Sequence, residues 1–425
     1  MNAQRPPDQA VILAGGRGKR LRPFSDSAPK PMIPIHGKPF LEYVVTLLRD
    51  QGIRRIVMLL GYLPDMICDY FGDGRSLGVH IEYSITPANN STCQRLRHAR
   101  ERLDEFFLLL YCDNYWPVQL SQMWERFSRA QAQVMTTIYS NRDNYSRSNV
   151  TLDSEGYVLR YDRSRTEKGL QGVDIGFGIW NKSIVDRVPP DDCPLEAALY
   201  SKLARERQLL GYVTDHRYYS IGSPERLPFT ERFLSRRPAI ILDRDGVLNK
   251  RPPRGQYVRR VQEFKWLDNA REALSLLCQA GYKVIVISNQ AGVARGFMTV
   301  DDVARIHQQM RREAEEAGGS IDAIYWCPHG WDEGCECRKP KPGMLFQAQR
   351  DFDLDLSRTL MVGDDERDAL AAQQAGSPCA LVTADNSLWQ ITSSLLSGKL
   401  PEFHSPALPV GESYVTGGRI TACAS

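Results

Sequence analysis

Short runs of apolar residues recur along this chain, and most of them end in glycine or in a polar side chain. Such runs lie at residues 10–14, 56–60, 106–110, 239–242, 284–287 and 360–362. Continuous apolar runs bounded by turn residues are typical of strands buried on both faces of a parallel sheet. Between them, residues 37–52 and 269–281 place apolar residues at helical spacing and close with a glycine. The alternation predicts an α/β fold built from doubly wound, Rossmann-like sheets.

A polar and basic stretch with prolines near both ends, residues 223–238, separates two sets of these patterns. With the length of 425 residues, it predicts two domains, at residues 8–228 and 238–384. Residues 385–425 contain scattered Gly, Pro and Ser and few sustained apolar patterns. We therefore expect them to form a tail that docks loosely or has no fixed structure.

Composition narrows the class of protein. The chain is 42% hydrophobic and 25% charged, with a net charge of +3, which is too small to indicate nucleic acid or membrane as the main partner. No apolar run approaches the ~20 residues of a membrane span, and the first residues lack the apolar core of a signal peptide, so we expect a cytoplasmic protein. Most of the ten cysteines are scattered singly, which does not suggest a disulfide framework. The sequence leaves the oligomeric state open.

The second predicted domain begins with a strand that ends in two carboxylates, Asp243-Arg-Asp245-Gly246. One carboxylate can attack phosphorus and form an aspartyl-phosphate, while the other protonates the leaving oxygen and later activates water. A strand-to-loop turn rich in Asp is the alternative for this motif taken alone. Three later strand ends or loops carry Ser288, Lys339 and Asp364, which suit phosphoryl oxygens, negative charge and Mg²⁺ respectively.

These four motifs, in this order, resemble the haloacid dehalogenase (HAD) phosphatase superfamily over residues 238–383. The resemblance implies that Asp243 is the nucleophile and Asp245 the general acid and base. It implies that Ser288 and Lys339 stabilise the phosphoryl group. It also implies that Mg²⁺ is bound by Asp243, Asp364 and the backbone carbonyl of Asp245.

A group of metal-binding residues lies just before Lys339. Cys327, His329, Cys335 and Cys337 supply three thiolates and one imidazole, the ligand set of a closed structural zinc site. A nucleic-acid-binding finger is the rival interpretation, but the ~12-residue spacer of a C₂H₂ finger is missing. We expect zinc to rigidify the loop that presents Lys339.

The Cys-Arg-Lys-Pro motif and the residues after Ser288 resemble the D,D-heptose 1,7-bisphosphate 7-phosphatases, with the zinc-containing histidinol-phosphate phosphatases as the runner-up. The resemblance implies substrate contacts by four residues: Asn289, Arg338, Arg295 and Tyr257. Two departures leave the sugar preference open. Residues 250–256 form a longer and more proline-rich loop than expected, and Asp365 replaces an expected lysine.

The first predicted domain opens with a strand that ends in a glycine turn, whose bare backbone amides can approach phosphates closely. The string from Gly15 to Pro23, followed by Lys30-Pro-Met, resembles the sugar-nucleotide pyrophosphorylases. The expected nucleotide-binding residues are Gly15, Gly16, Arg17, Gly18, Lys19, Arg20 and Lys30, and the resemblance implies Mg²⁺ at Asp113. Ser220 replaces a second metal-binding Asp, and residues 87–94 replace a glycine motif, so catalysis by this domain stays open.

Together the two domains predict consecutive steps. A heptose bisphosphate loses its 7-phosphate, and the heptose 1-phosphate then reacts with an NTP, GTP or ATP, to give NDP-heptose and pyrophosphate. The alternative is a histidinol-phosphate-type or other sugar-phosphate phosphatase with a non-catalytic nucleotide-binding domain. A zinc-dependent nucleic-acid binder is a third hypothesis, which the near-neutral charge disfavours.

Overall fold

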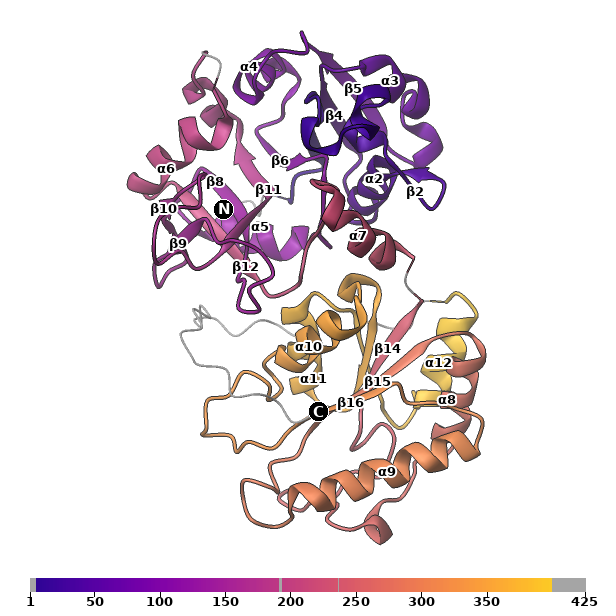
Figure 1. Cartoon of the computed structure of the whole chain (residues 1–425). Coiled ribbons are helices and arrows are strands. Elements are labelled where there is room, and N and C mark those ends of the chain that lie inside the picture. Colours follow the sequence, from indigo (N-terminus) through magenta and orange to yellow (C-terminus); the bar gives the residue numbers. More distant parts are fainter. Residues whose placement is uncertain (1–4, 191–192, 236, 400–425) are drawn as a thin grey trace. The chain divides into compact units, whose positions relative to one another are not determined.

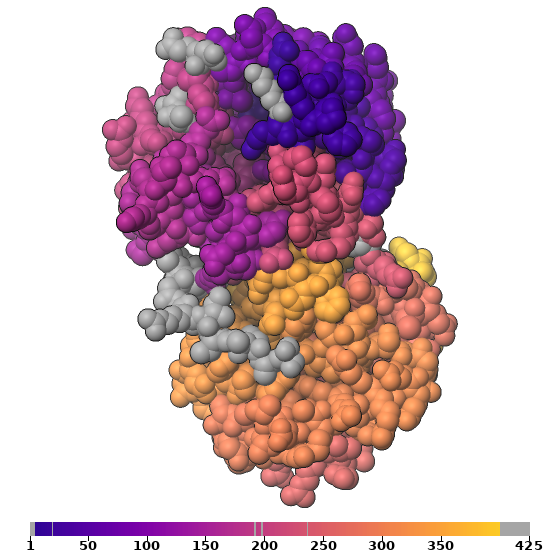
Figure 2. All heavy atoms as spheres, viewed as in Figure 1, coloured from indigo at the N-terminus to yellow at the C-terminus, as the bar shows by residue number. Residues whose placement is uncertain are grey.

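The computed structural model describes residues 5–190, 193–235 and 237–399. The chain divides after Ser235 into two compact units, coloured indigo to pink and pink to yellow in Figures 1 and 2. Four residues join the last helix of the first unit, α7 (Leu227–Leu234), to the first strand of the second, β14 (Ala239–Asp243). No helix in the described ranges is long and apolar enough to cross a membrane.

The first unit is built on a seven-stranded sheet in the order β12-β8-β11-β6-β1-β4-β5. These strands are β12 (Leu209–Thr214), β8 (Val134–Tyr139), β11 (Val173–Asn181), β6 (Phe106–Tyr111), β1 (Gln9–Leu13), β4 (Arg55–Leu60) and β5 (His80–Ile85). All neighbours pair in parallel except β11, which is antiparallel to both β6 and β8. Successive residues of β1 belong alternately to two buried clusters, so this strand is covered on both faces as its apolar run predicts.

Helices and short ribbons complete this unit. The helices are α1 (Phe24–Ser27), α2 (Phe40–Asp50), α3 (Pro64–Phe71), α4 (Thr92–His98), α5 (Leu120–Arg129), α6 (Ser201–Arg205) and α7. Three two-stranded ribbons are β2 (Pro34–Ile35) with β3 (Lys38–Pro39), β7 (Asn114–Tyr115) with β13 (Tyr219–Ser220), and β9 (Val150–Leu152) with β10 (Val158–Tyr161). The β7–β13 ribbon brings Ser220 beside Asn114, next to Asp113.

The second unit is a five-stranded parallel sheet in the order β16-β15-β14-β17-β18. Besides β14, its strands are β15 (Lys283–Asn289), β16 (Ala323–Cys327), β17 (Leu360–Gly363) and β18 (Cys379–Leu381). Helices α8 (Ala270–Gln279), α9 (Val300–Glu316) and α12 (Leu388–Leu396) pack on one face, and α10 (Gly343–Phe352) and α11 (Glu366–Ala375) pack on the other. The α/β class and the two doubly wound sheets are therefore confirmed (Figure 1).

The region predicted to be a loose tail differs in part. Residues 388–396 form helix α12, which packs against α8 and buries Leu388 and Ile391. Ser387 caps this helix, and Gln390 completes the capping box. The physical reason is a Ser-x-x-Gln start followed by apolar residues at helical spacing, a signal that the scattered polar residues obscure. Residues 400–425 of the predicted tail lie outside the described residues.

Candidate active sites

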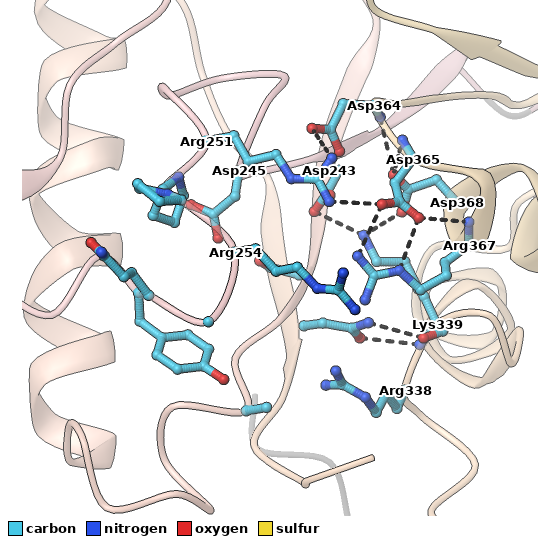
Figure 3. Close-up of a pocket in the computed structure, with 18 residues that line it drawn as sticks. Asp243, Asp245, Arg251, Arg254, Arg338, Lys339, Asp364, Asp365, Arg367 and Asp368 are labelled. Atoms are coloured by element: carbon cyan, nitrogen blue, oxygen red, sulfur yellow. Dashed lines mark hydrogen bonds and ion pairs between the residues drawn. The ribbon is translucent and has the colours of Figure 1, made fainter.

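The first candidate site lies at the carboxyl edge of the second sheet, where β14, β15 and β17 end side by side. Asp243 is the last residue of β14, and Asp364 directly follows β17 (Figure 3). Gly246 has a φ of +94°, and a Cβ there would come within 1.8 Å of Asp364 Oδ2. Glycine is therefore needed at this turn to let the second carboxylate approach the first.

Lys339 joins two buried carboxylates at this edge. Its Nζ lies 2.8 Å from Asp243 Oδ1 and 2.7 Å from Asp368 Oδ1, and only 3% of its side chain is exposed. Burial, only partly offset by Lys339, raises the pKa of Asp243 to about 7. Burial also opposes the charge on Lys339, but the two carboxylates outweigh it and raise the pKa of the ammonium group.

Asp243, Asp364 and Asp368 offer carboxylate oxygens that lie within 4.8 Å of one another, close enough to share a metal ion. Asp368 was not among the residues predicted from the sequence. It lies on the first turn of α11, and its Oδ2 accepts hydrogen bonds from the backbone amides of Asp364 and Asp365. The available signal was a carboxylate four residues after Asp364, in the first turn of a helix that Asp365 caps.

The side chain of Asp245 turns to a different set of partners. Arg244 binds both of its carboxylate oxygens, and Asn249 and Gln290 each donate one hydrogen bond. Burial would raise the pKa of Asp245, but the charge and hydrogen bonds of Arg244 outweigh it and lower the pKa. This carboxylate therefore rests ionised. The prediction for magnesium concerned the backbone carbonyl of Asp245, and it stays a prediction.

Behind Asp245 lies a buried pair. Arg244 is fully buried, and its Nη1 lies 3.3 Å from His307 Nε2, on helix α9. Burial and the charge of Arg244 lower the pKa of His307 to about 3, so this imidazole is neutral and can accept a hydrogen bond from the guanidinium. His307 thus completes the hydrogen bonding of the side chain that holds Asp245.

The end of β15 supports the lysine loop. Ser288 is buried, and its hydroxyl accepts a hydrogen bond from Gln290 at 2.8 Å. The amide side chain of Asn289 donates to the Lys339 carbonyl at 3.0 Å and accepts from the Lys339 amide at 3.1 Å. Asn289, predicted to contact substrate, therefore also fixes the backbone of Lys339 in the way a neighbouring strand would.

The carboxylates and Lys339 line a cavity of about 670 Å³, whose lining contains five acidic and five basic side chains. Arg251, Arg254, Arg338 and Arg367 lie around it with Lys339, and Tyr257, Ser288 and Asn289 also contribute to its lining (Figure 3). Of the predicted substrate residues, Arg295 is not in this lining. It lies over the rings of Tyr257, Phe297 and Trp331 and donates to the Tyr257 hydroxyl.

Asp365, at the position of an expected lysine, ties two of these arginines together. It accepts from Arg367 Nε at 2.9 Å and from Arg251 Nη2 at 2.7 Å. Arg251 Nη1 also lies 3.1 Å from Asp364 Oδ2. Burial nonetheless raises the pKa of Asp364 to about 6, against the charge of Arg251. The proline-rich loop at residues 250–256 thus places the Arg251 guanidinium at the carboxylate cluster, a position that the sequence did not predict.

The predicted zinc ligands converge. Cys327 Sγ lies 3.5 Å from His329 Nδ1 and 3.6 Å from Cys335 Sγ, and Cys337 Sγ lies 3.3 Å from His329 Nδ1. With Zn–S bonds of about 2.3 Å, the edges of a tetrahedron measure roughly 3.8 Å, so this donor set fits a zinc ion with small movements. Cys337 precedes Lys339 by two residues, which links the metal loop to the catalytic edge.

The second candidate site is a cavity of about 380 Å³ in the first unit. Its lining includes Gly15, Gly16, Gly18, Arg20, Lys30 and Asp113 among the predicted residues, with Asn90, Thr92, Arg95 and Gly222 added. Lys30 forms an ion pair with Asp113. Arg17 is not in this lining and lies over the ring of Tyr62 instead. The side chain of Lys19 lies outside the described part of the chain.

Ser220 has a structural role at this cavity. Its hydroxyl donates to the Asp113 carbonyl at 3.1 Å and accepts from the Gly222 amide at 3.0 Å. It therefore holds the turn that faces Lys30. Within the described residues, the two groups of side chains able to hold a metal ion both lie in the second unit. Asp113 is the one carboxylate in the lining of the first unit's cavity.

Comparison with known proteins finds relatives of both units. Residues 9–194 match the family model for nucleotidyl transferases, and residues 336–388 match the HAD-hydrolase-like model. A D-glycero-β-D-manno-heptose-1,7-bisphosphate 7-phosphatase of Bordetella bronchiseptica is 42% identical over 163 residues, which cover 38% of this chain and 88% of the relative. A Pseudomonas aeruginosa enzyme of the same name is 38% identical over 164 residues, 39% of this chain and 91% of the relative.

Among solved structures, the D,D-heptose 1,7-bisphosphate phosphatase of B. bronchiseptica complexed with magnesium and phosphate shares 40% identity and covers 40% of this chain and 90% of its own, with a TM-score of 0.34. The predicted resemblances to HAD phosphatases and to nucleotidyltransferases are confirmed by these matches. Through its second unit, the chain belongs to the D-glycero-β-D-manno-heptose-1,7-bisphosphate 7-phosphatase family, here joined to a nucleotidyl transferase domain.

Proposed function

We propose that the second unit, residues 238–384, removes the 7-phosphate of D-glycero-D-manno-heptose 1,7-bisphosphate through an aspartyl-phosphate. The observation that carries this proposal is the grouping of Asp243, Lys339, Asp364 and Asp368 at one edge of a cavity that is also lined by four arginines. The family membership supports the choice of substrate. Histidinol phosphate is the competing substrate, because its phosphatases share the same motifs.

The chemistry follows from the positions of the side chains. A carboxylate oxygen of Asp243 attacks phosphorus, and the bond to O7 of the sugar breaks. Lys339 balances the charge on the transferred phosphoryl group, and the hydroxyl of Ser288 can donate a hydrogen bond to it. Asp245 gives its proton to O7 and later takes one from the water that hydrolyses the aspartyl-phosphate.

Asp245 must gain a proton before it can act as an acid. Arg244 keeps it ionised in the resting arrangement, and the negative charge of an entering phosphate raises its proton affinity. Arg251, Arg254 and Arg338 line the same cavity and suit the second phosphate of a bisphosphate. Magnesium at Asp243 and Asp364, with Asp368, would neutralise phosphate charge.

We propose further that the first unit, residues 8–228, transfers a nucleotidyl group from GTP or ATP to heptose 1-phosphate. The match to the nucleotidyl transferase model and the cavity that joins the glycine turn to Lys30 and Asp113 support it. Lys30 suits the charge of a triphosphate and of the leaving pyrophosphate. With one carboxylate in the lining, magnesium would enter largely as the complex with the nucleotide. Dependence on NTPs favours a cytoplasmic location.

A binding-only first unit is the second candidate. It is favoured by the ion pair between Lys30 and Asp113 and by the use of Ser220 as a turn residue, because both reduce the ligands available to a metal ion. In this case the cavity would bind nucleotide without turnover. Zinc at Cys327, His329, Cys335 and Cys337 is compatible with both proposals for the first unit, because its proposed role is to support the Lys339 loop of the second unit.

Two assays on the full-length protein test these proposals. With Mg²⁺, phosphate release from the heptose bisphosphate should exceed release from histidinol phosphate, and Asp243→Asn should abolish it. Equal rates on both substrates, or turnover by the variant, would reject the substrate or the nucleophile. Pyrophosphate release from four NTPs with heptose 1-phosphate tests the first unit, and nucleotide binding without pyrophosphate release would establish the binding-only candidate.

A further inference from the structure

Arg95 on helix α4 is a buried charged group of the first unit that the proposed chemistry does not use. It is 3% exposed and lines the same cavity as the glycine turn. Its Nη1 donates to the Leu60 carbonyl at 2.7 Å and to the Thr86 hydroxyl at 2.5 Å. Its Nη2 donates to the Gly15 and Ala88 carbonyls, each at 3.2 Å. All four Nη hydrogens therefore go to neutral acceptors.

The charge of Arg95 has no carboxylate partner within the described ranges, and its Nε hydrogen has no acceptor there. Burial lowers the pKa of Arg95, yet an arginine stays protonated at neutral pH. An uncompensated cation at a cavity wall makes the potential inside the cavity positive and attracts anionic ligands. The one carboxylate in that lining, Asp113, is already paired with Lys30.

Two glycines make room for this side chain. A Cβ at Gly15 would lie 2.5 Å from Arg95 Cζ, and one at Gly61 would lie 2.2 Å from Nη1. The guanidinium is thus packed against the backbone of the glycine turn and of the residue that follows β4. A side chain at Gly15 would have to displace the Arg95 guanidinium, a reason for glycine that differs from the approach of phosphate predicted by its sequence motif.

The hydrogen bond from Arg95 to the Gly15 carbonyl fixes the direction of the Gly16 amide. This carbonyl accepts from Arg95 and from the Tyr62 amide. Because the carbonyl and the N–H of a trans peptide point in opposite directions, the Gly16 N–H points away from Arg95. Gly16 lines the cavity, and its N–H has no acceptor among the residues described. A free backbone donor at a cavity wall is a group that can bind phosphate oxygens.

We propose that Arg95 is the positioning residue of the nucleotide cavity, which sets the Gly16 amide for a nucleoside triphosphate and supplies fixed positive charge beside it. The inference rests on the proposed function only for the class of ligand. It differs from a purely structural role because the loss of its geometry should weaken nucleotide binding while the rest of the chain stays folded and active.

The test is direct binding of GTP in the presence of Mg²⁺ to the full-length protein by calorimetry. Arg95→Lys keeps the charge but cannot reach four acceptors, so we expect its Kd to rise at least tenfold. Arg95→Met should raise the Kd for GTP further. The slope of log Kd against log salt should also become shallower, because this variant lacks a positive charge near the ligand. Gly61→Ala presses a methyl group on the guanidinium and should also raise the Kd about tenfold.

Arg97→Met is the matched control. Arg97 lies on the same helix, is exposed, and donates to the Val188 carbonyl, outside the cavity. It should change the Kd less than twofold. Phosphate release should be unchanged in every variant, which reports an intact second unit, and an unchanged circular dichroism spectrum reports that the first unit is folded. Where transfer is measurable, the KM for NTP should rise more than kcat falls.

The results separate this inference from the proposed function. If Arg95→Lys and Gly61→Ala bind GTP as tightly as the wild type, Arg95 does not position the loop. If the wild type binds GTP without releasing pyrophosphate and the variants bind weakly, the inference stands and nucleotidyl transfer by this unit does not. If the wild type binds none of four NTPs, both are overturned.

Discussion

Lys339 is the position where one substitution should affect stability and chemistry together. Its ammonium group is buried between Asp243 at 2.8 Å and Asp368 at 2.7 Å. Lys339→Met keeps most of the side-chain volume and removes the charge, which leaves two carboxylates buried without their counter-ion. Breaking a buried ion pair by removing one partner costs about 3–5 kcal/mol. We expect the free energy of unfolding at pH 8 to fall by this amount.

The loss should depend on pH. The folded pKa of Asp243 is already raised by burial, and without Lys339 it rises further. A carboxyl whose folded pKa lies above its unfolded value destabilises the fold when ionised, and the fold regains stability as the pH falls through the folded pKa toward the unfolded one. The difference between wild type and Lys339→Met should therefore shrink between pH 8 and pH 5. Urea unfolding of the full-length protein, followed by circular dichroism at several pH values, measures it.

The second substitution Asp368→Asn provides the control. Added to Lys339→Met, it removes one of the two unpaired charges, so the double variant should be more stable than the single one at pH 8. Phosphate release should fall by a factor on the order of 10²–10³ in Lys339→Met, because a preorganised charge at the phosphoryl group is lost. A destabilisation below about 1 kcal/mol that does not change between pH 8 and pH 5 would refute the account of this buried pair.

Two further variants test the surroundings of the site. Cys335→Ser should lower the zinc content measured by metal analysis and weaken phosphate release through the Lys339 loop, and an unchanged zinc content would show that the cluster is not a zinc site. In the wild type, the free energy of unfolding should fall between pH 6.5 and pH 4.5, because His307 binds a proton in the unfolded state but stays neutral when buried. His307→Gln should make this fall less steep. The expected difference in slope is about 1.4 kcal/mol per pH unit. Equal slopes in urea titrations of the two proteins would contradict the neutral state of His307.

The meeting of the catalytic side chains in one site could be predicted from the sequence, because parallel strands end at one edge of a sheet. Asp243, Ser288 and Asp364 all follow apolar runs, and the edge brings them together. Asp368 and Arg251 could not be found in this way. The first lies on a helix and the second in an irregular loop, and their partners are defined only by the folded chain.

Other features were hidden by ordinary patterns. Arg95 is a charged residue on a short helix, a type that is rarely buried, and the room for its side chain is made by Gly15 and Gly61, which are distant in the sequence. The predicted substrate residue Arg295 lies after the Ser-Asn-Gln turn, but aromatic rings hold it outside the cavity lining. Strand β11 has no continuous apolar run, because Asp174, Gly176 and Gly178 interrupt it, and its antiparallel direction is defined only by its pairing with β6 and β8.

The four residues between α7 and β14 have a kinetic consequence. A covalent tether keeps one phosphatase and one nucleotide-binding unit together at a fixed ratio of one to one, at every level of expression and at every dilution. Short tethers give effective concentrations on the order of millimolar, far above those of two separate enzymes in a cell. A sugar 1-phosphate released by one unit is therefore formed close to the unit that we propose consumes it. Dilution of the purified protein should change this proximity very little, whereas an equimolar mixture of two separate chains would lose it.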